Sequence, residues 1–154
     1  MKKSTKFIIA LLVTVGALAI TYRVVNQAPS KDLAADAQMQ EIITSGGCLQ
    51  CHSGSPDLPF YANWPVASGM VQKDVTQGYR AFDMTEMAEA LKAGKPVGKV
   101  ALAKVEKVIM DGTMPKHAYY MVHWGSSVTD AKKEMAMAWV KQHRLAHYAN
   151  GLAA

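Results

Sequence analysis

The sequence predicts an all-α protein in which one apolar helix precedes a single helical domain. No segment of the 154 residues alternates apolar and polar side chains as a half-buried strand would, whereas several segments repeat apolar residues at helical spacing. The composition is 50% hydrophobic and 19% charged, which fits one compact core. We therefore expect residues 1–28 to be a signal peptide or membrane anchor and residues 29–154 to be one domain.

The N-terminal segment has the composition of an export signal. Three lysines within the first six residues precede an uncharged apolar run over residues 7–20. Residues 17–19, Ala-Leu-Ala, offer a small-x-small cleavage site, while extension to residue 25 approaches the roughly 20 residues that span a bilayer. A cleaved signal and a retained inner-membrane anchor over residues 7–25 both fit, and the short run before the cleavage site favours the anchor. We expect the rest of the chain in the periplasm, soluble or tethered.

The charge distribution argues against a nucleic-acid partner. Four of the 17 Lys and Arg residues lie in the first 28 positions, where no acidic residue occurs. The remaining chain carries 13 basic and 12 acidic residues and is therefore almost neutral. A nucleic-acid-binding domain needs basic side chains clustered on one face, so we expect no such partner.

The first two helices of the domain flank a loop rich in turn residues. Asp32 is a candidate N-cap for a helix with apolar residues at 33, 37, 42 and 43, which Gly46-Gly47 ends. Residues 53–65 combine Gly, Pro, Ser and Asn with aromatic side chains and predict a loop packed on apolar surface. A helix over about 66–78 follows.

Two shorter helices come next. Asp83 or Thr85 caps one that residues 94–96, Gly-Lys-Pro, close. Apolar positions between residues 100 and 109 predict another, which Asp111-Gly112 stops.

The last helix has the clearest pattern. Residues 127–130 supply cap chemistry, and a stripe at helical spacing follows it: Met135, Ala138, Trp139, Gln142 and Leu145. We expect Trp139 to be a core residue, and we expect His143 and His147 to be solvated rather than metal-bound.

Cys48-Leu49-Gln50-Cys51-His52 is the attachment sequence of c-type haem, and it contains both cysteines of the chain. Residues three and four apart share one face of a helical turn, so both sulfurs can reach the two vinyl groups of one porphyrin edge while His52 reaches the iron. The export signal places this motif where c-type haem is attached. We therefore expect one covalent haem c, with Cys48 and Cys51 as thioether residues and His52 as the proximal axial ligand.

Two other uses of the cysteines are disfavoured. A thioredoxin-like pair follows a strand at the start of a helix, and no βαβ unit is visible. A zinc site needs two more ligands at a suitable spacing, which the remaining histidines do not offer.

Met114 is the expected distal axial ligand. It lies in the loop 112–115 between a glycine and a proline, and a thioether is the usual partner of His in electron-transfer cytochromes. Met70 and Met121 are weaker alternatives, and His117 or His123 would supply a second imidazole. An open distal site is a further alternative. Several aromatic residues are candidates to line the haem pocket: Phe60, Tyr61, Trp64, Tyr119, Tyr120 and Trp124.

The chain resembles the haem-binding domain family of small exported mono-haem c-type cytochromes. Members occur alone behind an apolar segment or fused to di-haem cytochrome c peroxidase modules. The resemblance covers roughly residues 33–142 and rests on blocks at 48–53, 59–61, 65–66, 71–75, 78, 111–115, 119–123, 128–129 and 139. This chain departs from the family pattern at two positions: it has Phe60 where the family commonly has Trp, and Trp124 where a Pro is expected. Neither of these residues is a proposed iron ligand.

This resemblance implies a helical fold like that of class I cytochromes c, with residues 29–154 as a mono-haem cytochrome domain. It implies electron transfer rather than an enzyme activity. Donor and acceptor cytochromes, an oxidase, a reductase or a peroxidase would be the partners. The alternative is a haem-based peroxidase or a gas or redox sensor with a labile or open distal site.

Overall fold

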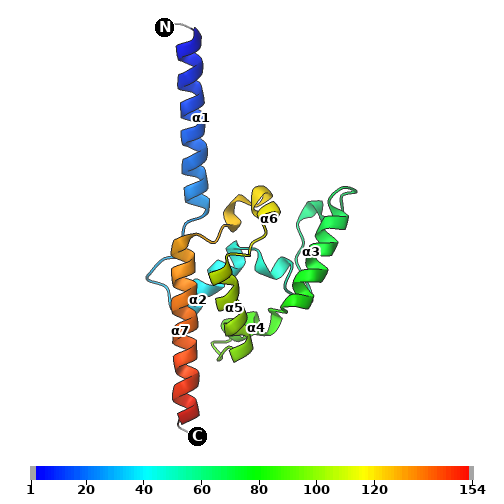
Figure 1. Cartoon of the computed structure of the whole chain (residues 1–154), viewed down its shortest axis with the longest axis vertical. Coiled ribbons are helices and arrows are strands. Elements are labelled where there is room, and N and C mark those ends of the chain that lie inside the picture. The colour runs from blue at the N-terminus through cyan, green and yellow to red at the C-terminus, as the bar shows by residue number, and fades with distance from the viewer. Residues whose placement is uncertain (1–2, 153–154) are drawn as a thin grey trace.

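The computed structural model describes residues 3–152, and within this range every regular element is a helix, which confirms the all-α prediction. Figure 1 shows α1 standing clear of a helical domain. In chain order the elements are α1 (Lys3–Val25), α2 (Ala35–Ser45), η1 (Cys48–Gln50), η2 (Phe60–Asn63), α3 (Ser68–Ala81), α4 (Thr85–Lys92), α5 (Lys99–Asp111), α6 (His117–Val122), η3 (Trp124–Ser126) and α7 (Asp130–Leu152), where η marks a 3-10 helix.

Helix α1 is long and apolar enough to cross a membrane, and none of its residues is buried. The chain that leaves it is fixed to the domain at η3. Asn26 is only 3% exposed, and its side chain donates to the carbonyl of Trp124 and accepts from the amide of Ser127 at 2.9 Å. The Tyr22 hydroxyl also bonds the Ser127 hydroxyl at 2.8 Å. These contacts fix the direction in which α1 leaves the domain.

The core of the domain lies where α2, α4, α5 and α7 pack together. Amphipathic sequences explain this packing, because each helix buries the apolar residues that recur on one face. The buried residues include Met39, Ile42, Ile43, Met87, Leu91, Leu102, Val105, Ala136, Trp139 and Val140. Leu49 and Cys48 pack against this cluster from η1, so one side of the attachment motif rests on the core.

Several helix limits differ from the sequence prediction. Asp32 does not cap α2, which begins three residues later; its backbone amide instead donates to the hydroxyl of Ser30 at 3.2 Å in a local turn. Helix α3 starts two residues later and ends three residues later than expected. The N-cap of α4 is Met84, so the expected cap at Asp83 or Thr85 is wrong, although the Asp83 carboxylate accepts from the Thr85 amide at 2.9 Å just before the helix. Gly112 ends α5 with φ +60°, as its freedom from a Cβ allows.

The buried face of α7 is rotated relative to the predicted stripe. Trp139 is buried as expected, but Ala138 and Gln142 are exposed and Leu145 is 58% exposed. The buried positions are instead Lys132, Ala136, Trp139 and Val140. The prediction failed because a lysine and a histidine occupy inward positions where an apolar pattern expects aliphatic side chains.

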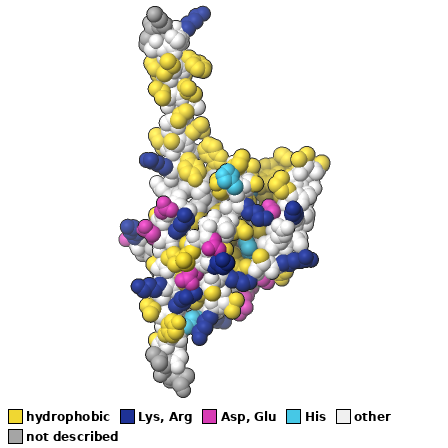
Figure 2. Space-filling model, viewed as in Figure 1, with side chains coloured by type: hydrophobic (Ala, Val, Ile, Leu, Met, Phe, Trp, Pro, Cys, Tyr) yellow, Lys and Arg dark blue, Asp and Glu magenta, His cyan; other side chains and the backbone are white. Residues whose placement is uncertain are grey.

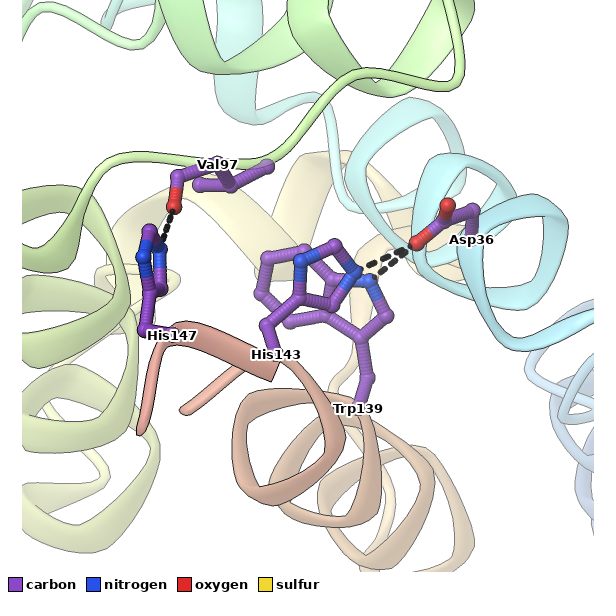
Figure 3. Close-up of polar contacts among 5 residues, drawn as sticks. All are labelled: Asp36, Val97, Trp139, His143 and His147. Carbon is purple, nitrogen blue, oxygen red and sulfur yellow. Dashed lines mark hydrogen bonds and ion pairs between the residues drawn. The ribbon is translucent and has the colours of Figure 1, made fainter. Parts of the chain in front are cut away.

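The two histidines of α7 make specific contacts, so their prediction as solvated side chains is wrong. His143 lies beside Trp139, and both bond Oδ1 of Asp36 on α2 at 2.7 Å (Figure 3). Nε2 of His147 donates to the carbonyl of Val97 at 2.7 Å. Within residues 3–152, no group of three or more His, Cys, Asp or Glu side chains is placed to hold a metal ion.

Candidate functional site

The attachment motif forms one tight turn after α2. Gly47 has φ +64°, a conformation that glycine adopts without steric cost, and Cys48–Gln50 then form η1. The amide of His52 donates to the carbonyl of Cys48 at 3.0 Å, which closes the turn. A Cβ on Gly47 would lie 2.0 Å from the hydroxyl of Tyr119, so the turn also needs glycine there for close packing against α6.

His52 is oriented by the chain segment between α3 and α4. Its Nδ1 lies 2.8 Å from the carbonyl of Phe82, and since a carbonyl only accepts, this nitrogen carries the proton. The amide of Met84 donates to the carbonyl of His52 at 2.7 Å. The Nε2 atom therefore keeps its lone pair, which is the arrangement of a metal-ligating histidine whose other nitrogen is held by a backbone oxygen.

Both cysteines are free and half-buried. Burial raises the pKa of the Cys48 thiol to about 11, against the smaller opposing effect of the Lys132 charge. Burial also raises the pKa of Cys51, the nearby Asp74 carboxylate raises it further, and Lys116 lowers it. Reactive redox thiols have a lowered pKa. These environments therefore disfavour a thiol redox centre and fit thiols whose role is attachment.

Helix α3 packs directly on the attachment turn through Gly78. A Cβ at this position would lie 2.5 Å from the carbonyl oxygen and 2.9 Å from the Cβ of Cys51. Real Cβ atoms do not approach other atoms so closely, so only glycine permits this contact. Helix α3 thus forms one wall beside Cys51.

Aromatic residues connect η2 and α6 to the same turn. The hydroxyl of Tyr119 donates to the side-chain oxygen of Gln50 at 2.6 Å, and its ring stacks on His123 with 3.9 Å between centroids. The Nε2 atom of His123 bonds the hydroxyl of Tyr61 at 2.8 Å. Burial raises the pKa of Tyr119 to about 12, so this hydroxyl stays protonated and can donate at neutral pH.

Met114 lies in the loop between α5 and α6, as expected, and is half-buried. Two residues later, the ammonium of Lys116 pairs with Asp74 of α3 at 2.6 Å, and this contact ties the loop to the helix that packs on Cys51. The alternative thioethers are more open, since Met70 is 57% and Met121 is 63% exposed.

The two histidine alternatives differ in how their rings are engaged. Both ring nitrogens of His123 are engaged, Nε2 by Tyr61 and Nδ1 by the carbonyl of Tyr119 at 3.0 Å. His117 is exposed and packs beside the ring of Tyr120.

The surroundings of the turn fit a haem. The macrocycle is large and mostly apolar, so its site needs apolar surface beside the attachment residues. Figure 2 shows hydrophobic side chains gathered over the part of the domain nearest α1. Large apolar side chains of η2, α6 and the segments that follow them are exposed: Phe60, Trp64, Val66, Met121, Val122 and Trp124. Together with the free Nε2 of His52, this donor set and surface suit haem binding.

The sequence profile of a family described as "Haem-binding domain" matches residues 7–142. The chain belongs to this haem-binding domain family. The match begins within the apolar N-terminal helix, well before the residue 33 at which the resemblance was expected to start.

Residues of this haem-binding domain protein are similar to a curated relative, "Cytochrome c peroxidase Ccp" of Escherichia coli (strain K12). The two are 36% identical over 104 residues, which is 68% of this chain and 22% of the relative. The chain therefore spans about a fifth of the length of the relative it matches. No solved structure matches the chain significantly.

Sequence reasoning missed two parts of the site in this haem-binding domain protein. The carbonyl of Phe82 carries no side-chain signal, because any residue provides a carbonyl. Lys132 is 1% exposed, although a lysine is expected at the surface. The sequence does contain a signal for this burial. Lys132 precedes Ala136 by four residues and Trp139 by seven, so it shares their face of α7.

Proposed function

We propose that this haem-binding domain protein transfers electrons in the periplasm through one haem c. Cys48 and Cys51 form the thioether bonds, His52 is the proximal ligand and Met114 is the distal ligand. The observation that carries the proposal is the hydrogen bond from Nδ1 of His52 to Phe82, made within a complete Cys-x-x-Cys-His turn. It leaves Nε2 as the only ring nitrogen able to bind a metal.

When bound, the haem supplies one-electron exchange, and the chain sets its ligands. Phe82 and Met84 hold His52 in one orientation and one tautomer. The pair of Lys116 and Asp74 restrains the loop that carries Met114. If His52 and Met114 both held the haem iron, the thioether would raise the reduction potential and leave no ligand position for a substrate, which would suit a carrier better than an enzyme.

In this proposal, helix α1 anchors the protein in the inner membrane. Its length and composition suffice for a span, and the three lysines among the first six residues of the sequence favour a cytoplasmic N-terminus. Since Asn26 and Tyr22 fix the end of α1 to η3, the anchor would hold the haem domain close to the membrane surface. Donor and acceptor proteins would meet the domain there.

A second candidate is a haem-based peroxidase or sensor, and the peroxidase name of the relative favours it. This function requires an open or labile distal position and a polar group that assists there. His117, three residues after Met114, is the nearest histidine in sequence, and it is exposed. The match covers only 22% of the relative, so the same likeness suits a domain that delivers electrons.

The test is the absorption spectrum of the protein produced with c-type haem maturation, compared with that of Met114→Ala. We expect haem that stays attached after denaturation and a weak far-red sulfur-to-iron band in the ferric protein. Met114→Ala should remove the band, while Met121→Ala, a change at an exposed methionine, should leave it. The unmutated protein should not respond to carbon monoxide. A high-spin spectrum that shifts with carbon monoxide would overturn the carrier function and favour the peroxidase or sensor.

A further inference from the structure

A positive charge is buried beside the haem attachment turn. Lys132 is 1% exposed, and its ammonium donates to the carbonyl of Ser127 at 3.1 Å and to the hydroxyl of Ser45 at 3.4 Å. Among residues 3–152, no carboxylate forms an ion pair with it. A buried ammonium with only neutral partners is rare, because leaving water costs more than such contacts return.

The dipoles of the two helices around Lys132 do not offset the free-energy cost of burying its charge. Lys132 lies in the first turn of α7, where the helix dipole disfavours a cation. Ser45 is the last residue of α2, where the dipole favours one. These two effects oppose each other, so the burial of the charge remains largely uncompensated. A glutamine could donate to Ser127 without the charge, so the charge is not needed for this bond.

The charge lies next to the residue that would hold the haem. Ser45 is three residues before Cys48, and a Cβ built on Gly46 between them would lie 3.2 Å from the Cys48 sulfur. Cys48 also packs against the core cluster to which Ala136 and Trp139 of α7 belong. No other lysine or arginine among the described residues is buried. Among the described residues, Lys132 is therefore the one buried Lys or Arg, and it contacts the end of α2 three residues before Cys48.

We propose that the buried ammonium of Lys132 raises the reduction potential of the haem attached at Cys48. The oxidised haem gains one electron and becomes the reduced haem, which carries one positive charge less. A fixed cation nearby therefore disfavours the oxidised form. Because the charge is out of water, salt screens it weakly. The inference rests on the proposed covalent attachment at Cys48.

The test is a redox titration of the full-length, haem-loaded protein, followed by its absorption spectrum. Lys132→Gln removes the charge and retains a donor for Ser127, whereas Lys132→Arg retains the charge. Lys133→Gln is the matched control, since Lys133 is the next residue of α7 and forms an exposed pair with Asp130. We expect Lys132→Gln to lower the midpoint potential by about 59 mV, a tenfold change in a one-electron equilibrium. The other two variants should stay close to the unmutated protein.

Ionic strength adds a second readout that separates the effect of a buried charge from that of an exposed one. The difference between the unmutated protein and Lys132→Gln should persist from low to high salt, because it arises from a buried charge. An unchanged midpoint in Lys132→Gln, or an equal shift in Lys133→Gln, would overturn the inference. Haem stain after denaturing electrophoresis separates the two proposals. Loss of covalent haem in the unmutated protein defeats both, whereas attached haem with an unshifted potential defeats this one alone.

Discussion

Gly78→Ala tests whether α3 packs on the attachment turn as closely as the structure shows. The new Cβ would lie 2.5 Å from the backbone carbonyl oxygen of Cys51. Because the backbone of the helix meets the backbone of the turn at this contact, no flexible side chain can move aside, and one of the two segments must shift. Overpacking of this kind costs about 1–3 kcal/mol. Alanine returns up to about 1 kcal/mol through helix propensity. With the full return we therefore expect a net loss of up to about 2 kcal/mol in the free energy of unfolding.

Gly69→Ala is the matched control, because Gly69 lies on the same helix and a Cβ there meets nothing within 4 Å. Thermal unfolding followed by circular dichroism should place the midpoint of Gly78→Ala several degrees below that of Gly69→Ala, at roughly 2–8 °C per kcal/mol. The yield of attached haem should also fall in Gly78→Ala, since the displaced carbonyl belongs to Cys51. Equal midpoints and equal haem yields in the two variants would refute the packing argument.

Two further variants test contacts outside the attachment turn. Asp36→Ala leaves the buried indole N–H of Trp139 without its acceptor and removes the partner of His143. We therefore expect the free energy of unfolding to fall by about 2 kcal/mol, and not by more, because the Asp36 carboxylate is 39% exposed. Chemical denaturation measures this loss of stability, and Glu41→Ala, a substitution at an exposed residue of α2, is the control. An Asp36→Ala loss no larger than that of Glu41→Ala would contradict the role given to Asp36. Asn26→Ala removes the acceptor of the Ser127 amide, and this amide should exchange hydrogen about tenfold or more faster. Exchange as slow as in Gln27→Ala, a change at the exposed neighbouring residue, would show that Asn26 does not fix the end of α1.

The helices and the attachment turn could be predicted from the sequence because their signals are local. The Cys-x-x-Cys-His spacing defines its own geometry, and Gly112 ends α5 through its own backbone freedom. Helix α6 was missed, since six residues between two loops are too few to show a period. The face of α7 was misjudged because Lys132 and His143 point inward, where their partners Ser127 and Asp36 satisfy them. Such partners become known only in three dimensions.

The contacts that orient the site are distant in sequence and mostly involve backbone atoms. Thirty residues separate His52 from the carbonyl that holds it, and Tyr119 reaches Gln50 across 69 residues. Such contacts leave no residue-type pattern, so the sequence can name His52 as the expected ligand without showing which nitrogen it offers.

The two sides of the attachment turn are held differently, and this difference suits a redox site. On one side, Cys48 and Leu49 rest on the core formed by α2, α4, α5 and α7. On the other side, η2, α3 and α6 reach the turn through Gly78 and the bond between Tyr119 and Gln50. If the proposed function holds, the core beneath Cys48 would limit rearrangement during electron exchange. The exposed apolar side chains of η2 and α6 supply surface that a haem can cover, so its binding would add to the packing of that side.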